Sequence, residues 1–337
     1  MRDDSIAVSA RASPALTAVV VTRAPLHYVE GADASIDRPA HVRAGSSLAW
    51  VPGGIALVQD DANFVAVVDP HDGSARAITL PAGSEGRRLF DDLRGNKAQK
   101  LDLEACLSVD TDDGVLFIAL GSGSTPHREQ VLLIRGWEAG RFEPTLVHVP
   151  RLYDTLRRDQ AFAGSELNIE GAVWLGDRIR LFGRGNGVLR AGVQPINATC
   201  DLDWPAFVAH VRLPERAPSP IPTNIVRYDL GTIDGVPLSF TDATLHGNAI
   251  LFSATAEESP DVTRDGRVAG SAIGAIDRAG RARWAPLVDD AGIAFAGKVE
   301  GLVLSREGDQ RAYLVVDADD PRSASILCAV ELRGDWG

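Results

Sequence analysis

Four carboxylate side chains recur at matching places in four similar stretches of the chain: Glu104, Glu170, Asp242 and Glu300. In each stretch a small residue or two and a short apolar run follow the acid, which is the pattern of a strand entering a hydrophobic core. A related stretch carries Ser47 at this place instead of an acid. We expect strands built on one repeat to present these positions at a common place in the fold.

Carboxylates that converge in a narrow space raise one another's pKa and cannot all remain ionised without a partner. Protonation, pairing with lysine or arginine, or binding of a cation would each resolve the repulsion. Oxygen ligands without clustered His or Cys favour Ca²⁺, with Mg²⁺ as the alternative. The competing interpretation is structural: the acids accept backbone hydrogen bonds or pair with Lys100, Lys298 and Arg184.

Basic and polar side chains near the repeats are candidates for binding a small anionic ligand. Arg184 could bind an anion, with Asn186 orienting it, although Gly-Asn-Gly at 185–187 is equally a plain turn. Lys100 and Lys298 precede two of the repeats, and Asp60 and Arg128 stand in loops between expected strands. The alternative for Arg128 is a solvated loop residue.

The spacing of strand and turn patterns predicts an all-β fold, a five-bladed β-propeller in a single domain over residues 14–337. The third repeat is expected to use strands over 169–175, 178–183, 207–213 and 224–230. The fifth repeat lacks an outer strand, so the N-terminal strand over 15–22 is expected to close the last blade. Six blades remain possible if residues 24–45 form a further unit. We expect disorder over 1–13 and one short helix over 153–162.

The motifs at 100–105, 169–171 and 299–301 resemble uncharacterised bacterial propellers of the phytase-like, or esterase-like, group. One metal held at the channel by one residue per blade is also similar to the five-bladed calcium-activated apyrases. This resemblance implies Ca²⁺ bound by Glu104, Glu170, Asp242 and Glu300, with Ser47 on the first blade.

The net charge of −12 argues against nucleic acid as a partner, because phosphate backbones are bound by basic surfaces. Three cysteines predict buried thiols of a reducing compartment, and no apolar run reaches the length of a membrane span. We therefore expect a cytoplasmic protein. Two functions stay open: a divalent-metal-dependent hydrolase of a small phosphate or carboxyl ester, or a non-catalytic propeller that binds a ligand or protein through structural carboxylates.

Overall fold

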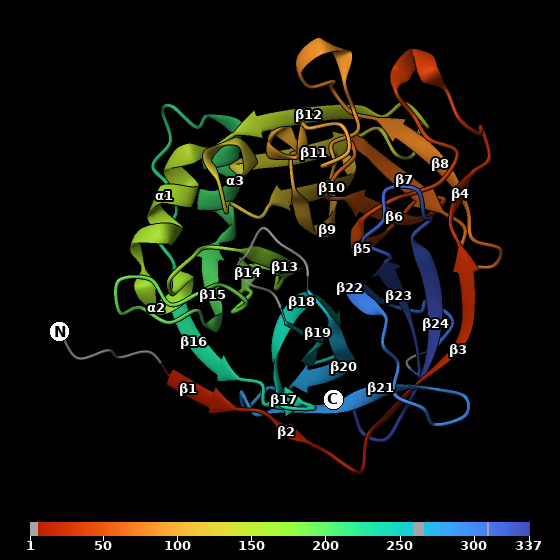
Figure 1. Ribbon diagram of the computed structural model, residues 1–337. Coiled ribbons are helices and arrows are strands. Elements are labelled where there is room, and N and C mark those ends of the chain that lie inside the picture. The colour runs from red at the N-terminus through yellow and green to blue at the C-terminus, as the bar shows by residue number, and fades with distance from the viewer. Residues whose placement is uncertain (1–5, 259–265, 309) are drawn as a thin grey trace.

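The computed structural model describes residues 6–258, 266–308 and 310–337. Its strands are arranged around a central axis (Figure 1). In these residues the strand pairings form five four-stranded antiparallel meanders. The first two are β5 (Gly45–Val51), β6 (Gly54–Gln59), β7 (Phe64–Val68) and β8 (Ser74–Thr79), then β9 (Leu103–Thr111), β10 (Gly114–Gly121), β11 (Gln130–Arg135) and β12 (Glu143–His148). The third is β13 (Ile169–Trp174), β14 (Arg178–Gly183), β15 (Asn197–Asp203) and β16 (Thr223–Asp229). The last two are β18 (Val236–His246), β19 (Ala249–Glu257), β20 (Val268–Ile276) and β21 (Ala282–Asp289), then β22 (Lys298–Leu304), β23 (Arg311–Asp317), β24 (Ile326–Arg333) and β3 (Thr17–Pro25).

The innermost strand of each meander contacts the innermost strands of both neighbours, in the order β5, β9, β13, β18, β22 and back to β5. This closed ring confirms the predicted all-β propeller fold, whereas five as the number of blades stays our interpretation of the meanders. Short strands extend the outer edges of three meanders: β4 (His27–Tyr28), β1 (Ile6–Ser9) and β2 (Arg11–Ala12). A further short strand, β17 (Thr232–Ile233), pairs with the innermost strand β18. Pairing of β1 with β16 and of β2 with β21 corrects the expectation of disorder for residues 6–12, while residues 1–5 lie outside the described residues.

The N-terminal strand completes the last meander, as predicted. β3 pairs antiparallel with β24, matching Thr17 to Arg333 and Pro25 to Ile326. Its other edge pairs in parallel with β21 over three residues, so the fourth and fifth meanders share one continuous sheet. Ring closure therefore depends on a strand from the opposite end of the chain.

The third meander differs from its predicted composition, because residues 207–213 are not a strand. Helix α3 (Trp204–Arg212) occupies this stretch, and β15 supplies the third strand. Asp203 caps the helix by accepting a hydrogen bond from the Ala206 amide, and Pro205 fits its first turn. Phe207 and Val211 are four residues apart, so a helix buries both on one face.

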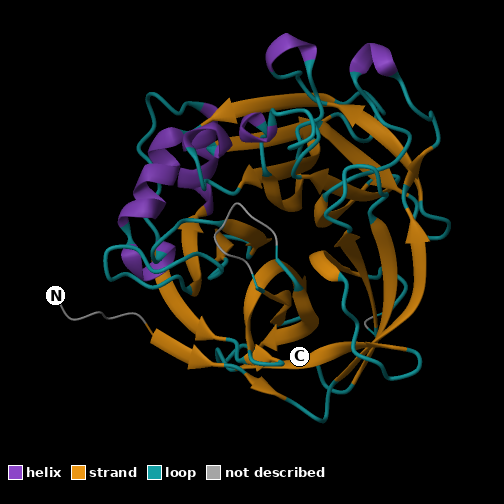
Figure 2. Cartoon of the chain, in the orientation of Figure 1, coloured by secondary structure: helices purple, strands orange, loops and turns teal. Residues whose placement is uncertain are grey.

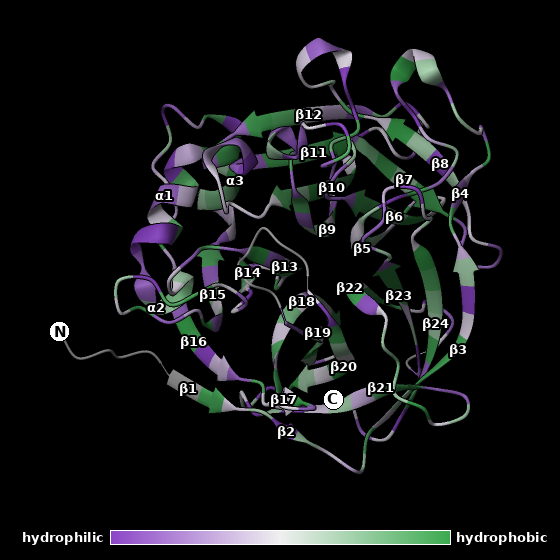
Figure 3. Cartoon of the chain, viewed as in Figure 1, coloured by the Kyte–Doolittle hydropathy of each residue, from purple (hydrophilic) through white to green (hydrophobic). Residues whose placement is uncertain are grey.

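Helices lie outside the strand ring (Figure 2). The apolar core lies between neighbouring meanders, and the hydrophobic residues are concentrated along their strands (Figure 3). α1 (Pro150–Arg158) and α2 (Gln160–Ala163) replace the single expected helix and pack with α3 against the second and third meanders. Short 3₁₀ turns are η1 (Ala34–Ile36), η2 (Ser84–Gly86), η3 (Lys97–Gln99) and η4 (Pro126–Arg128). Cys106, Cys200 and Cys328 are buried free thiols. Among helices in the described residues, none is long and apolar enough to cross a membrane.

Candidate functional site

Each innermost strand carries a β-bulge at the same place, which is how the fold positions the repeated acids. The pairing register of each inner strand with its neighbour skips one residue, and the skipped residues are Ser46, Glu104, Glu170, Thr241 and Glu300. A bulge leaves its extra residue outside the hydrogen-bonded ladder and re-aims its side chain. Three of the five bulges therefore present a glutamate, and two present a hydroxyl residue.

Asp242 and Ser47, both predicted to bind metal, stand one residue after the bulge and lie outside the cavity described below. The Asp242 carboxylate accepts hydrogen bonds from the Leu302 amide at 2.8 Å, the Ala243 amide at 2.8 Å and Ser47 Oγ at 3.1 Å. Ser47 Oγ in turn accepts from the Cys106 amide. This network joins β18, β5, β22 and β9, so both side chains hold neighbouring inner strands together.

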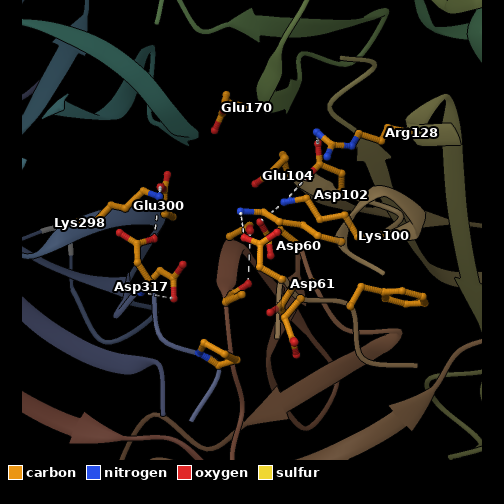
Figure 4. Close-up of a pocket in the computed structure, with 18 of the residues that line it drawn as sticks. Asp60, Asp61, Lys100, Asp102, Glu104, Arg128, Glu170, Lys298, Glu300 and Asp317 are labelled. Carbon is orange, nitrogen blue, oxygen red and sulfur yellow. Dashed lines mark hydrogen bonds and ion pairs between the residues drawn. The ribbon is translucent and has the colours of Figure 1, made fainter. Parts of the chain in front are cut away.

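A cavity of about 210 Å³ opens at the mouth of the ring, among the bulges and the loops that follow the second strands (Figure 4). Its described lining contains twelve carboxylate and five basic side chains and neither His nor Cys. The acids are Asp60, Asp61, Asp91, Asp92, Asp102, Glu104, Glu170, Glu257, Glu300, Asp317, Asp319 and Asp320, and the bases are Lys97, Lys100, Arg128, Arg184 and Lys298. Glu104, Glu170 and Glu300 reach it from different sides (Figure 4).

On the β9 side, a buried ion-pair cluster surrounds Asp102. Lys100 Nζ lies 2.6 Å from Asp102 Oδ1 and 2.5 Å from Asp60 Oδ2. Arg128 Nη1 lies 2.9 Å from Asp102 Oδ2, and Ser122 Oγ donates to the same oxygen. Burial opposes ionisation, but the two cations prevail and hold the pKa of Asp102 below its ordinary value. Arg128 is thus a buried ion-pair partner, not the solvated loop residue that the sequence left open.

Arg184 connects three acids on the opposite side. Its Nη2 lies 2.7 Å from Glu257 Oε2, and its Nη1 lies 3.4 Å from Glu170 Oε1 and 3.6 Å from Glu300 Oε2. Asn168 Nδ2 donates to Glu170 Oε1 at 2.6 Å and lies 3.5 Å from Asn186 Oδ1. Arg184 and Asn186 therefore both line the cavity, as predicted, but Arg184 is already engaged by carboxylates.

Lys298 pairs with acids of β22 and of the loop after β23. Its Nζ lies 2.9 Å from Asp319 Oδ1 and 3.3 Å from Glu300 Oε1. The predicted pairing of lysines with the repeated acids is thus present for Lys298 and Glu300. Lys100 instead neutralises Asp60 and Asp102, which flank Glu104.

Several acids remain without a full set of partners. Within the described residues, no hydrogen bond or ion pair reaches Glu104, and Glu300 Oε2 makes no hydrogen bond although Glu300 is only 6% exposed. Burial, reinforced by Asp102 and Glu170, raises the pKa of Glu104 well above its ordinary value. Burial also raises the pKa of Glu170 to about 8, against the opposing effect of Arg184. Burial, together with Asp60, raises the pKa of Asp61 to about 7.

Asp102 and Asn168 are site residues that sequence reasoning missed. Each stands two positions before a bulged glutamate, where Lys298 stands in the fifth meander, and side chains two apart share a face of a strand. The same spacing in the three repeats is the signal that could have found them. The loop around Asp91 and Leu93 also lines the mouth, and no repeat marks it because it connects two meanders.

Fold and site together define a β-propeller with a carboxylate-rich cavity at the mouth of its ring. The chain belongs to the family of unknown function DUF6929, whose model matches residues 41–332. No curated protein is similar to it in sequence.

Three solved structures with enzyme names are similar in fold. Glutaminyl cyclase from Myxococcus xanthus is 9% identical, with 98% of this chain and 100% of that chain covered and a TM-score of 0.46. The arabinanase Arb43A of Bacillus subtilis is 9% identical, with 88% and 95% covered and a TM-score of 0.42. A glycosyl hydrolase from Bacteroides ovatus is 10% identical, with 86% and 84% covered and a TM-score of 0.40. Likeness this low does not extend to activity.

Proposed function

We propose that the cavity binds a divalent cation, Ca²⁺ with Mg²⁺ as the alternative, and that the protein hydrolyses a small anionic ester there. The observation that carries the proposal is the cluster of Asp60, Asp102 and Glu104, which offer carboxylate oxygens within 4.8 Å of one another. Carboxylate oxygens from several chain segments are the ligands that Ca²⁺ prefers.

The charge and burial of the surrounding residues support a cation. The described lining contains twelve acids and five bases, and acids still outnumber bases when Arg43, Arg94 and Arg322, which pair with lining acids from outside, are included. Glu300 is buried, faces the cavity and leaves Oε2 without a hydrogen bond. Arg184 and Lys298 pair with Glu300 but also with Glu257 and Asp319, so they share their charge among several carboxylates. Burying ionised carboxylates is costly, and a bound cation would offset part of that cost.

A bound cation would polarise the ester carbonyl or phosphoryl group, or a water molecule beside it. Arg184 and Lys298 also line the cavity and would neutralise the anionic group of the ester. Asn186 would orient that group through its amide.

Calorimetric titration of the purified protein with CaCl₂ and with MgCl₂ tests the cation. We expect Glu104→Gln to weaken Ca²⁺ binding at least about tenfold, because it removes a charged oxygen ligand, which corresponds to about 1.4 kcal/mol. Glu143→Gln is the matched control, since Glu143 is exposed at the start of β12. Equal Ca²⁺ affinity of all three proteins, or none in the wild type, contradicts the site.

Hydrolysis is then measured with 4-nitrophenyl phosphate and 4-nitrophenyl acetate. Turnover that requires Ca²⁺ or Mg²⁺ and is lost in Glu104→Gln supports the hydrolase. Absence of turnover with Ca²⁺, Mg²⁺ and Mn²⁺ overturns it.

A non-catalytic propeller that binds a ligand or a protein is the second candidate. Lys100 favours it, because its ammonium already neutralises Asp60 and Asp102. In that case the carboxylates only hold neighbouring segments together. Titration with CaCl₂ would then give no heat of binding, and Ca²⁺ would leave the melting temperature unchanged.

A further inference from the structure

Lys100 Nζ contacts two of the three carboxylates that make up the candidate cation site. It lies 2.5 Å from Asp60 Oδ2 and 2.6 Å from Asp102 Oδ1. Oxygen ligands surround Ca²⁺ at about 2.3–2.6 Å, nearly the same distances. The ammonium therefore occupies the place between these two oxygens that a divalent cation bridging them would take.

We propose that Lys100 is an internal competitor for the cation site and, once displaced, a positioning residue for the anionic group of the ligand. The inference rests on the proposed function, since it concerns the same site. Its independent support is Glu300, whose buried Oε2 faces the cavity and makes no hydrogen bond, with Arg184 Nη1 3.6 Å away.

The surroundings of Asp102 suit an exchange of its partner. Asp102 Oδ2 is held by Arg128 at 2.9 Å and by Ser122, and neither contact involves Lys100. Asp102 therefore keeps its orientation when the ammonium leaves Oδ1. Glu104 has no hydrogen bond in the described residues, so it is available as the third ligand at no cost in lost contacts.

The displaced ammonium has to find another anion. Its side chain is 9% exposed, and a buried ammonium without a counter-ion is strongly disfavoured. The four-carbon stem of lysine allows Nζ to swing away from the carboxylates while its Cα stays in place. An anionic ligand in the cavity supplies the new partner. Cation and anion then strengthen each other's binding, because coupling between two sites is reciprocal.

Lys298 provides a matched comparison within the same cavity. It is also 9% exposed at its side chain and stands two residues before the bulged Glu300 on β22. Among the described residues it forms ion pairs with Asp319, Glu300 and Glu257, none of which belongs to the three-carboxylate cluster. Replacing either lysine removes one positive charge from the cavity, but only Lys100 contacts the candidate ligands.

Calorimetric titration with CaCl₂ alone, at constant ionic strength, compares the wild type with Lys100→Met and Lys298→Met. We expect Lys100→Met to bind Ca²⁺ at least about tenfold more tightly than the wild type, equivalent to about 1.4 kcal/mol, and Lys298→Met to stay within about threefold. Wild-type affinity in Lys100→Met, or an equal gain in Lys298→Met, overturns the competition and leaves the cation site standing. No Ca²⁺ binding in the wild type or in Lys100→Met overturns the site itself.

A measurement on the wild type covers the case in which Lys100→Met fails to fold. The chain has lysine only at positions 97, 100 and 298, so acetylation of each amine is read unambiguously by mass spectrometry. We expect CaCl₂ to raise the acetylation rate of Lys100 several-fold relative to Lys298, since the displaced amine leaves its two carboxylates. An unchanged ratio under saturating Ca²⁺ contradicts displacement.

Discussion

Inner strands β9 and β18 carry an acid within one residue of the same bulge, yet the two acids have opposite surroundings. On β9 the bulged residue is Glu104, which faces the polar cavity without a hydrogen-bond partner in the described residues. On β18 the bulged residue is Thr241, and Asp242 follows it inside the protein with three donors around it. A shift of one residue therefore separates an acid available to a ligand from an acid that holds the ring together.

Small residues explain how the ring accommodates Asp242. The position after the bulge is Ala105 in β9, Gly171 in β13 and Gly301 in β22, where neighbouring inner strands approach closely. A Cβ on Gly171 would lie 3.2 Å from the Asp242 carbonyl carbon. An acid fits at this position only in β18, because donors from β5 and β22 meet its oxygens there.

The largest effect should come from Asp242→Ala. It leaves the Leu302 and Ala243 amides and the Ser47 hydroxyl buried without their acceptor, at an expected loss of about 3–5 kcal/mol in the free energy of unfolding. Urea denaturation measures it. Glu104→Ala is the counterpart and should cost less than about 1 kcal/mol without added cation, since no contact is lost. Similar losses in both variants would erase the distinction between the two acids.

Gly301→Ala should have an intermediate effect. Its new Cβ would lie 2.7 Å from Val315 Cγ1 and 3.0 Å from the Ser46 carbonyl oxygen, so neighbouring strands must move apart. We expect a loss of about 1–3 kcal/mol, typical of overpacking, in the same urea experiment. Ala105 already has a Cβ at the matching place in β9, which makes the wild-type β9 an internal reference. A stability within error of the wild type would show that close strand approach does not constrain this position.

Glu170→Gln should change the pH dependence of stability, by the smallest amount. Burial raises the pKa of Glu170 from 4.5 to about 8, so the folded protein keeps a proton that the unfolded chain releases between these values. The stabilising effect is complete below about pH 4.5 and is lost as pH rises through about 8. Glutamine removes this contribution. The fall in the free energy of unfolding between pH 5 and 8 should therefore become less steep, by about 1 kcal/mol per pH unit or less.

Urea denaturation at several pH values measures that slope. Glu143→Gln, which changes an exposed carboxylate, should retain the wild-type slope. A Glu170→Gln protein that retains it as well would mean that Glu170 is ionised in the folded state.

The sequence predicted the ring and one side of its site because both follow from repetition. Apolar runs separated by turn residues give the meanders, and the recurring acid located Glu104, Glu170 and Glu300. Asp60 and Arg184, which the sequence analysis named as candidates for binding a ligand, also line the cavity.

What the sequence could not give is the offset created by a bulge. Thr241 and Asp242 both follow Phe240 in an apolar run. The hydrogen-bond register of β18 with β19 decides which of the two lies outside the ladder, and the residue types do not predict that register. For the same reason the sequence analysis took Ser47 as the β5 equivalent of Glu104, whereas the bulged residue is Ser46. Pairing partners such as Arg128 with Asp102 come from different loops, so only the tertiary structure reveals them. The helix over 204–212 was missed because its valines also suit a strand.

Closure by β3 sets an order on folding. β3 leaves the ribosome roughly three hundred residues before β24, its antiparallel partner, so the last meander stays incomplete throughout synthesis. During that time the outer edge of β24 and the apolar side chains of β3, among them Ala18 and Val20, have no native partner. Pairing of segments so distant in sequence is slow. We therefore expect docking of β3 to be a late step of folding, with these groups open to aggregation until it occurs.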